Sequence, residues 1–75
     1  MGTTLHEVDA GAAFRIDAVG DEDVRAQLLR MGFLDGEVEC RQRLRNGPVV
    51  IRRRGTELAL GKPIAQDVQI TRTDE

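Results

Sequence analysis

The stretch from residue 28 to residue 60, LLRMGFLDGEVECRQRLRNGPVVIRRRGTELAL, decides the fold of this chain. It begins with the end of a helix and continues through a tight turn bounded by glycines. Three short runs of alternating residues follow, and the dipeptides Asn46-Gly47 and Gly55-Thr56 separate them. Asn-Gly between two such runs is the strongest short-range signal of a β-hairpin. The stretch therefore predicts three antiparallel strands joined by tight turns.

Alternation predicts which side chains of these strands face the core, because successive residues of a strand point to opposite faces. In the first run Val38, Cys40 and Leu44 fall on one face, although Gln42 interrupts it. The inward positions of the next two runs are Val49, Ile51 and Arg53, then Leu58 and Leu60. An unpaired buried charge is costly. We therefore expect Arg53 to leave the barrel end, to meet an acid, or to meet a partner.

The residues before this stretch predict a strand and a helix. Alternation from Ala12 to Ala18, with Phe14 and Ile16 as anchors, is typical of a half-buried strand. Asp21 then provides an N-cap, since its carboxylate can accept amide hydrogen bonds of the first helical turn.

The helix is predicted to pack on the sheet through one apolar stripe. Val24, Leu28 and Met31 follow the spacing i, i+4 and i+7. Gly32 comes directly after this stripe and suits a left-handed C-cap. Leu29 lies off the stripe. A helix of about three turns is too short to be stable alone, so it must pack on the sheet.

The residues after this stretch complete the sheet. Gly61-Lys62-Pro63 breaks the third strand, and Ile64 to Gln66 predicts a short helical turn. Val68 and Ile70 form a last strand, and residues 71–75 are predicted to be a frayed polar tail. The fold class is therefore mainly β: a small SH3-like barrel of five strands with one inserted α-helix. Residues 1–75 make a single domain with a core of about residues 5–70.

Composition limits the function to non-catalytic classes. The 75 residues contain one cysteine and no tyrosine, and there is no serine to act as a nucleophile. His6 is expected to be a solvated imidazole, and Cys40 a buried, inert thiol. We find no Gly-rich phosphate loop and no ligand spacing for a metal. The sequence thus predicts no enzyme, no cofactor and no catalytic or metal-binding residue, and the absence of a signal peptide predicts a cytoplasmic location.

Charge is distributed unevenly along the chain. Residues 41–54 hold six of the 11 basic residues and no acid, so the other five basic residues accompany all 13 acidic ones, a net charge of −8 there. The outward members of this basic patch are Arg41, Arg43, Arg52 and Arg54. They could follow a phosphate backbone, or pair across strands with Glu37, Glu39 and Glu57. The chain has two phenylalanines and no Trp or Tyr, so it offers no stacking platform for unpaired bases, and its overall charge is −2. We therefore favour the second interpretation.

The order of several motifs resembles the FeoA family of small accessory proteins of ferrous iron uptake. The resemblance runs from about Leu5 to Ile70. This chain departs from the family pattern in three places. Asp35 stands where proline is usual, the segment from Gly36 to Val38 is one residue shorter than usual, and Arg53 stands where an apolar residue is common. Its motifs are Leu28-Leu29-Arg30-Met31-Gly32-Phe33, Gly36 with Val38, Gly47-Pro48-Val49-Val50-Ile51-Arg52, Arg54-Gly55, Leu58-Ala59-Leu60 and Val68-Gln69-Ile70.

The resemblance implies an SH3-like barrel and a partner, the membrane ferrous iron transporter with its cytosolic GTP-binding domain. It implies a non-enzymatic adaptor at the inner face of the membrane. We expect docking through the helix end and the turn after it, at Leu29, Arg30, Phe33 and Leu34, although Phe33 and Leu34 could instead plug the core. Self-association through Leu29 and Leu34 is a further expectation.

Two other functions stay open at this point. One is a barrel that binds nucleic acid or another protein in iron-dependent regulation through the basic patch, although nucleic acid is not the partner we expect. The other is a module that binds ferrous iron, a transition metal ion, directly; only the family setting motivates it.

Overall fold

The central stretch forms three antiparallel strands, as the sequence predicts: β3 (Val38–Arg43), β4 (Val49–Arg53) and β5 (Thr56–Leu60). The computed structural model describes residues 3–74. Arg54 and Gly55, with φ of 52° and 83°, form the two-residue turn between β4 and β5. This turn begins one residue earlier than the sequence predicts. The pairing Arg53↔Thr56 follows directly from it.

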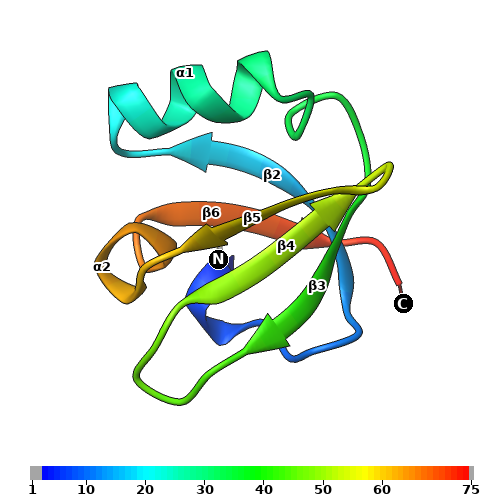
Figure 1. The fold of residues 1–75 in the computed structure, drawn as a ribbon, viewed down its shortest axis with the longest axis vertical. Helices are drawn as coiled ribbons and strands as arrows, with labels where there is room; N and C mark the ends of the chain where they lie inside the picture. The colour runs from blue at the N-terminus through cyan, green and yellow to red at the C-terminus, as the bar shows by residue number, and fades with distance from the viewer. Residues whose placement is uncertain (1–2, 75) are drawn as a thin grey trace.

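The other elements wrap around this hairpin pair (Figure 1). They are β1 (Thr3–Thr4), the 3-10 helix η1 (Leu5–Glu7), β2 (Ala13–Val19), α1 (Glu22–Arg30), α2 (Lys62–Ala65) and β6 (Val68–Arg72). The strands form one antiparallel sheet in the order β1-β6-β2-β3-β4-β5. The sixth strand is β1, which pairs Thr3 with Ile70. The mainly β, SH3-like fold is thus confirmed.

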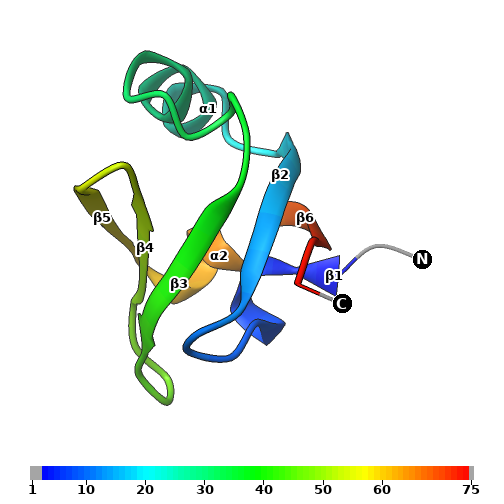
Figure 2. The ribbon, with the colours of Figure 1, turned by 90° about the vertical axis from the view of Figure 1, so that its right-hand side faces the viewer.

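The sheet curls without closing, as Figure 2 shows. Within residues 3–74 the terminal strands β1 and β5 each pair on one side only. The SH3-like barrel predicted from the sequence is therefore open in the structure, between β1 and β5. The physical reason is that β1 stops after two residues, where η1 begins, so it pairs with β6 and does not extend to β5.

A β-bulge in β3 changes which side chains of this strand face the core, so the predicted faces are wrong after Cys40. Cys40 pairs with Ile51 and Gln42 with Val50, so Arg41 is an extra residue in β3. The extra residue reverses the alternation after Cys40. Leu44, predicted to face the core, is instead 45% exposed.

The core lies inside the curl, with α1 across one end of it (Figure 1). Leu28 is fully buried, while Val24 and Met31 are half-buried against the core, as the stripe predicts. Asp21 caps α1 by accepting a hydrogen bond of 3.0 Å from the Val24 amide. The fully buried side chains of largest volume include Phe14, Phe33, Leu5, Leu28 and Ile51.

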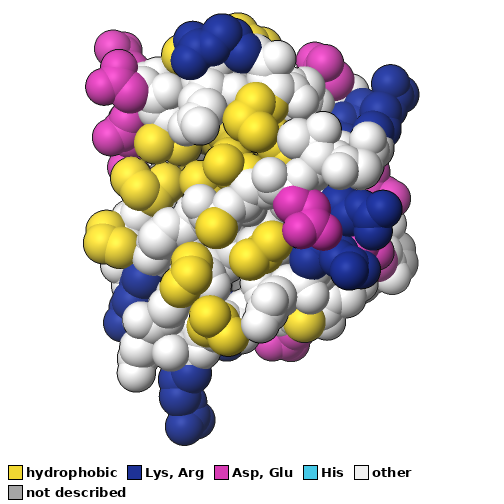
Figure 3. All heavy atoms as spheres, viewed as in Figure 1, with side chains coloured by type: hydrophobic (Ala, Val, Ile, Leu, Met, Phe, Trp, Pro, Cys, Tyr) yellow, Lys and Arg dark blue, Asp and Glu magenta, His cyan; other side chains and the backbone are white. Residues whose placement is uncertain are grey.

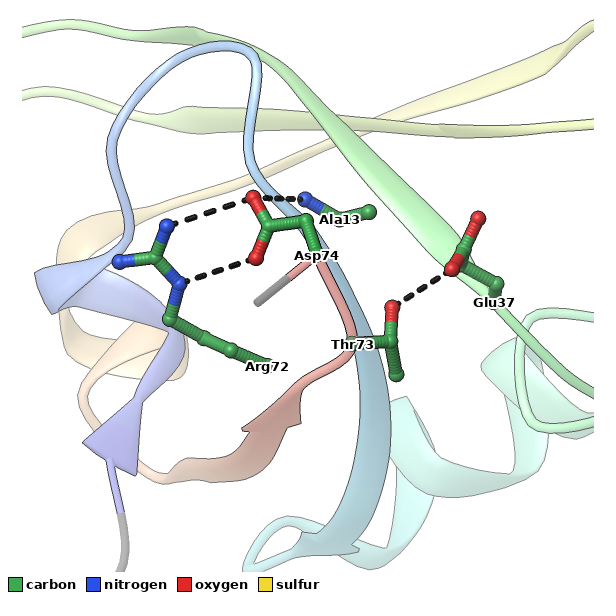
Figure 4. Close-up of polar contacts among 5 residues, drawn as sticks. All are labelled: Ala13, Glu37, Arg72, Thr73 and Asp74. Atoms are coloured by element: carbon green, nitrogen blue, oxygen red, sulfur yellow. Dashed lines mark hydrogen bonds and ion pairs between the residues drawn. The ribbon is translucent and has the colours of Figure 1, made fainter.

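The C-terminal residues are bound to the sheet rather than frayed (Figure 4). Strand β6 continues to Arg72, and the Thr73 amide donates to the Ala13 carbonyl at 3.0 Å. The Ala13 amide donates to Asp74 Oδ2 at 3.2 Å, and Thr73 Oγ1 donates to Glu37 Oε2 at 2.6 Å. The amide and carbonyl of Ala13 at the start of β2 thus hold residues 73 and 74 in place, so the predicted frayed tail is wrong for residues 71–74. Glu75 lies outside the described residues.

Candidate docking surface

The predicted docking residues at the end of α1 differ in their exposure to solvent. Leu29 is 51% exposed and Arg30 is exposed, whereas Leu34 is half-buried. Phe33 is fully buried in the core, so its side chain is not available to a partner. We define the α1-end surface as Leu29, Arg30 and Leu34. Phe33 anchors the turn that carries this surface.

A Schellman motif fixes the backbone of this turn. Gly32, with φ of 83°, donates to the Leu29 carbonyl at 3.2 Å, and the Phe33 amide donates to the Leu28 carbonyl at 2.9 Å. The predicted left-handed C-cap at Gly32 is confirmed. Because these bonds hold the backbone, the α1-end surface is largely formed before any partner arrives.

Arg53 locks the same turn from the neighbouring hairpin. Its Nε donates to the Gly32 carbonyl at 2.9 Å, and its Nη1 donates to the Glu37 carbonyl at 3.0 Å. The half-buried guanidinium therefore satisfies two main-chain oxygens, rather than an acid or a partner. A Cβ atom at Gly36 would lie 3.0 Å from Nη1, so glycine there makes room for the guanidinium. Sequence reasoning found Arg53 conspicuous but could not identify its acceptors, because they are backbone atoms.

The basic patch is partly engaged within the chain. Arg41 forms an ion pair with Glu57 at 3.4 Å, and Arg43 Nε donates to the His6 carbonyl at 2.6 Å. Arg52 and Arg54 are exposed. Of the predicted acidic partners, Glu57 forms the pair; Glu37 instead accepts from Thr73. Two of the four arginines in the patch are thus engaged by groups of the same chain.

Cys40 and His6 are the two side chains of types that commonly bind transition metals. Cys40 is buried, and burial raises the pKa of its thiol, as expected of an inert cysteine. His6 is half-buried, and its Nδ1 is shielded without a hydrogen-bond partner among residues 3–74, so the predicted solvated imidazole is wrong. Across the same residues, no group of three or more His, Cys, Asp or Glu side chains is placed to hold a metal ion.

None of the helices in the described part of the chain has the length and hydropathy to cross a membrane.

Comparisons with known proteins identify the family. The FeoA domain model matches residues 3–72. A crystal structure of the iron uptake regulatory protein FeoA is 25% identical, with a TM-score of 0.78, and the match covers 97% of this chain and 100% of that one. The NMR structure of a FeoA-like protein from Clostridium acetobutylicum is 26% identical, with a TM-score of 0.75, and the match covers 99% of this chain and 90% of that one. No curated protein matches the sequence. The chain therefore belongs to the FeoA family, whose domain spans nearly all of it.

Proposed function

We propose that this chain is a non-enzymatic accessory protein of ferrous iron transport. It docks in the cytoplasm on the membrane transporter, through the transporter's cytosolic GTP-binding domain. The observation that carries the proposal is the α1-end surface of a FeoA domain: a leucine that is 51% exposed lies beside an arginine, on a backbone held by the Schellman motif and by Arg53.

Rigidity of this surface supports a docking role. Association loses less conformational entropy when the contacting turn is already ordered. Leu29 and Leu34 would be covered by an apolar patch, and Arg30 would lie against a carboxylate at its rim. A contact centred on three residues suits a weak, regulated complex better than a permanent one.

Matched substitutions test the docking surface. Leu29→Asp and Leu34→Asp each place a charge in the expected apolar contact. Leu44→Asp alters a similarly exposed leucine in the loop after β3, which lies far from α1 (Figure 1). We expect the first two to weaken binding to the isolated GTP-binding domain at least tenfold in calorimetry, and Leu44→Asp to leave it unchanged. Equal affinities for all three folded variants would refute this surface.

The nucleic-acid alternative is weaker, because the side chains of Arg41 and Arg43 already bind groups of the same chain. Basic side chains that neutralise phosphates give binding that strengthens as salt falls. A filter-binding assay at low salt tests this directly. Retention of DNA or RNA at micromolar protein would revive the alternative.

A further inference from the structure

Strand β5 has an open edge. It pairs with β4 over its five residues, Thr56 to Leu60, and within residues 3–74 nothing pairs with its other side. Natural proteins protect such edges with lysine, proline, bulges or covering elements, because an exposed edge is a template for another strand. Within β5 the one such device is the charge of Glu57, and the strand contains no lysine, proline or bulge.

The register identifies the backbone groups on this edge. In a hairpin with a two-residue turn the flanking residues form the first hydrogen-bonded pair, which here is Arg53 and Thr56. Hydrogen-bonded pairs then alternate along the strands. Thr56, Leu58 and Leu60 therefore direct their amides and carbonyls to β4. Glu57 and Ala59 direct theirs to the open edge.

An incompletely covered apolar surface adjoins the edge. Leu58 of β5 and Val24 and Met31 of α1 are each only half-buried against the core. Figure 3 shows hydrophobic side chains gathered over the gap between α1 and β5. A strand added to β5 would extend the sheet in front of this gap and remove more of these side chains from water.

Charged side chains of opposite sign lie at the two ends of the gap between α1 and β5, so two copies of the chain could pair their opposite charges. Figure 1 shows that α1 and β5 run in opposite directions. The start of α1 carries Asp21, Glu22 and Asp23. The other end carries Arg30, at the last turn of α1, and Arg54, in the turn before β5, against one acid, Asp35, in the turn after α1. A half-turn about an axis between these ends would bring acidic groups of one copy to basic groups of the other.

We propose that this edge binds a second copy of the chain, with β5 antiparallel to β5 of the second copy and a two-fold axis at Leu58. In this register Glu57 of each copy lies opposite Ala59 of the other, so no like charges face each other within the strand pair. The outward amides and carbonyls of Glu57 and Ala59 pair across the axis, and the two Leu58 side chains meet. The two α1 helices lie on the same face of the joined sheet, antiparallel.

The strand pair is short, so the dimer is weak and forms at high micromolar concentration. Sedimentation equilibrium over micromolar to millimolar protein tests the proposal. We expect Ala59→Pro to shift the monomer–dimer equilibrium at least tenfold toward monomer, because proline removes the outward amide. Ala59→Val, an exposed substitution that keeps the amide, is the matched control and should dimerise as the wild type does.

Amide hydrogen exchange tests the register independently. On raising the protein concentration, the amides of Glu57 and Ala59 should exchange more slowly, whereas those of Thr56, Leu58 and Leu60 are protected at all concentrations. A wild type that stays monomeric at millimolar concentration would overturn the proposal, as would Ala59→Pro dimerising normally.

Charge reversal tests the relative orientation of the two copies. Asp23→Lys and Arg30→Glu should each weaken the dimer, and the double variant should regain it, because each reversed end then meets a reversed partner. This inference is separate from the docking proposal. If wild type stays monomeric while Ala59→Pro abolishes binding of the GTP-binding domain, the edge serves that partner and self-pairing is wrong. If Leu29→Asp dimerises as the wild type does but no longer binds the GTP-binding domain, the result would support both the dimer and the docking proposal.

Discussion

Arg53 Nε donates a hydrogen bond of 2.9 Å to the carbonyl oxygen of Gly32, the residue that terminates α1. This contact joins the β4–β5 hairpin to the end of α1, two parts of the molecule 21 residues apart in sequence. The same guanidinium binds the Glu37 carbonyl at the start of β3. The turn that carries the α1-end surface is thereby fixed at both ends by one side chain.

Removing this side chain should destabilise the fold. Arg53→Ala leaves two carbonyls without their charged donor, and hydrogen bonds to a charged group contribute about 1.5–3 kcal/mol each when intact. Since the guanidinium is half-buried and water can replace part of it, we expect a loss of about 1–3 kcal/mol in the free energy of unfolding. Urea denaturation measures this loss. Arg52→Ala, an exposed neighbour on β4, should change stability by less than about 0.5 kcal/mol.

Gly36 and Arg53 should be energetically coupled. In Gly36→Ala the new Cβ would lie 3.0 Å from Arg53 Nη1, a contact tighter than most Cβ contacts, so the guanidinium must shift slightly from its two hydrogen bonds. We expect Gly36→Ala to destabilise the wild type and to cost little in the Arg53→Ala background. Additive losses in the double-mutant cycle would show that the two residues act independently.

Phe33 should behave as a core residue rather than a contact residue. Its side chain is fully buried, and truncating a buried Phe to Ala typically costs about 3–5 kcal/mol. That approaches the whole stability of a small domain. Thermal unfolding of Phe33→Ala should therefore show a large fall in Tm or an unfolded chain. A native-like Tm would contradict this placement.

Stability should fall in acid as Asp74 is protonated. The hydrogen bond from Arg72, and then the one from the Ala13 amide, hold the pKa of Asp74 below its usual value of 3.8. A carboxyl with a lowered folded pKa stabilises the fold fully above its unfolded value, and that contribution disappears as the pH falls through the folded pKa. Asp74→Asn should therefore lose less stability than wild type below about pH 4. Denaturation curves across this pH range, with exposed Asp9→Asn as control, check the effect.

The thiol of Cys40 should be unreactive in the folded protein. Burial raises its pKa, so little thiolate is present at neutral pH, and reagents cannot reach the buried sulfur. Labelling with an aromatic disulfide should proceed at the rate of unfolding. Rapid labelling under native conditions would mean that β3 opens locally.

The sequence predicts the strands and α1 well, because their signals are local. The cap at Asp21, the stripe of α1 and the hairpin turn near Asn46-Gly47 all depend on neighbouring residues, although this turn is closed by the hydrogen bond from Gly47 to Leu44, one residue earlier than predicted. The bulge at Arg41 is different: it depends on how β3 pairs with β4, which a single strand does not reveal. The predicted inward position of Leu44 is wrong for this reason.

The candidate docking surface was only partly predictable. Spacing placed Leu29 off the buried stripe, and it is exposed. Phe33 is buried and Leu34 is half-buried, and this difference depends on how the chain turns after Gly32. The roles of Arg53 and Asp74 depend on backbone atoms distant in sequence, so no pattern of side-chain types could reveal them.

An amide NMR titration of the labelled chain with the soluble GTP-binding domain of its transporter tests the proposed function most directly. The account predicts shifts that cluster at Leu29, Arg30 and Leu34 and saturate with the added domain. Shifts confined to Arg41–Arg54, or no shifts at saturating domain, would contradict docking through the α1-end surface.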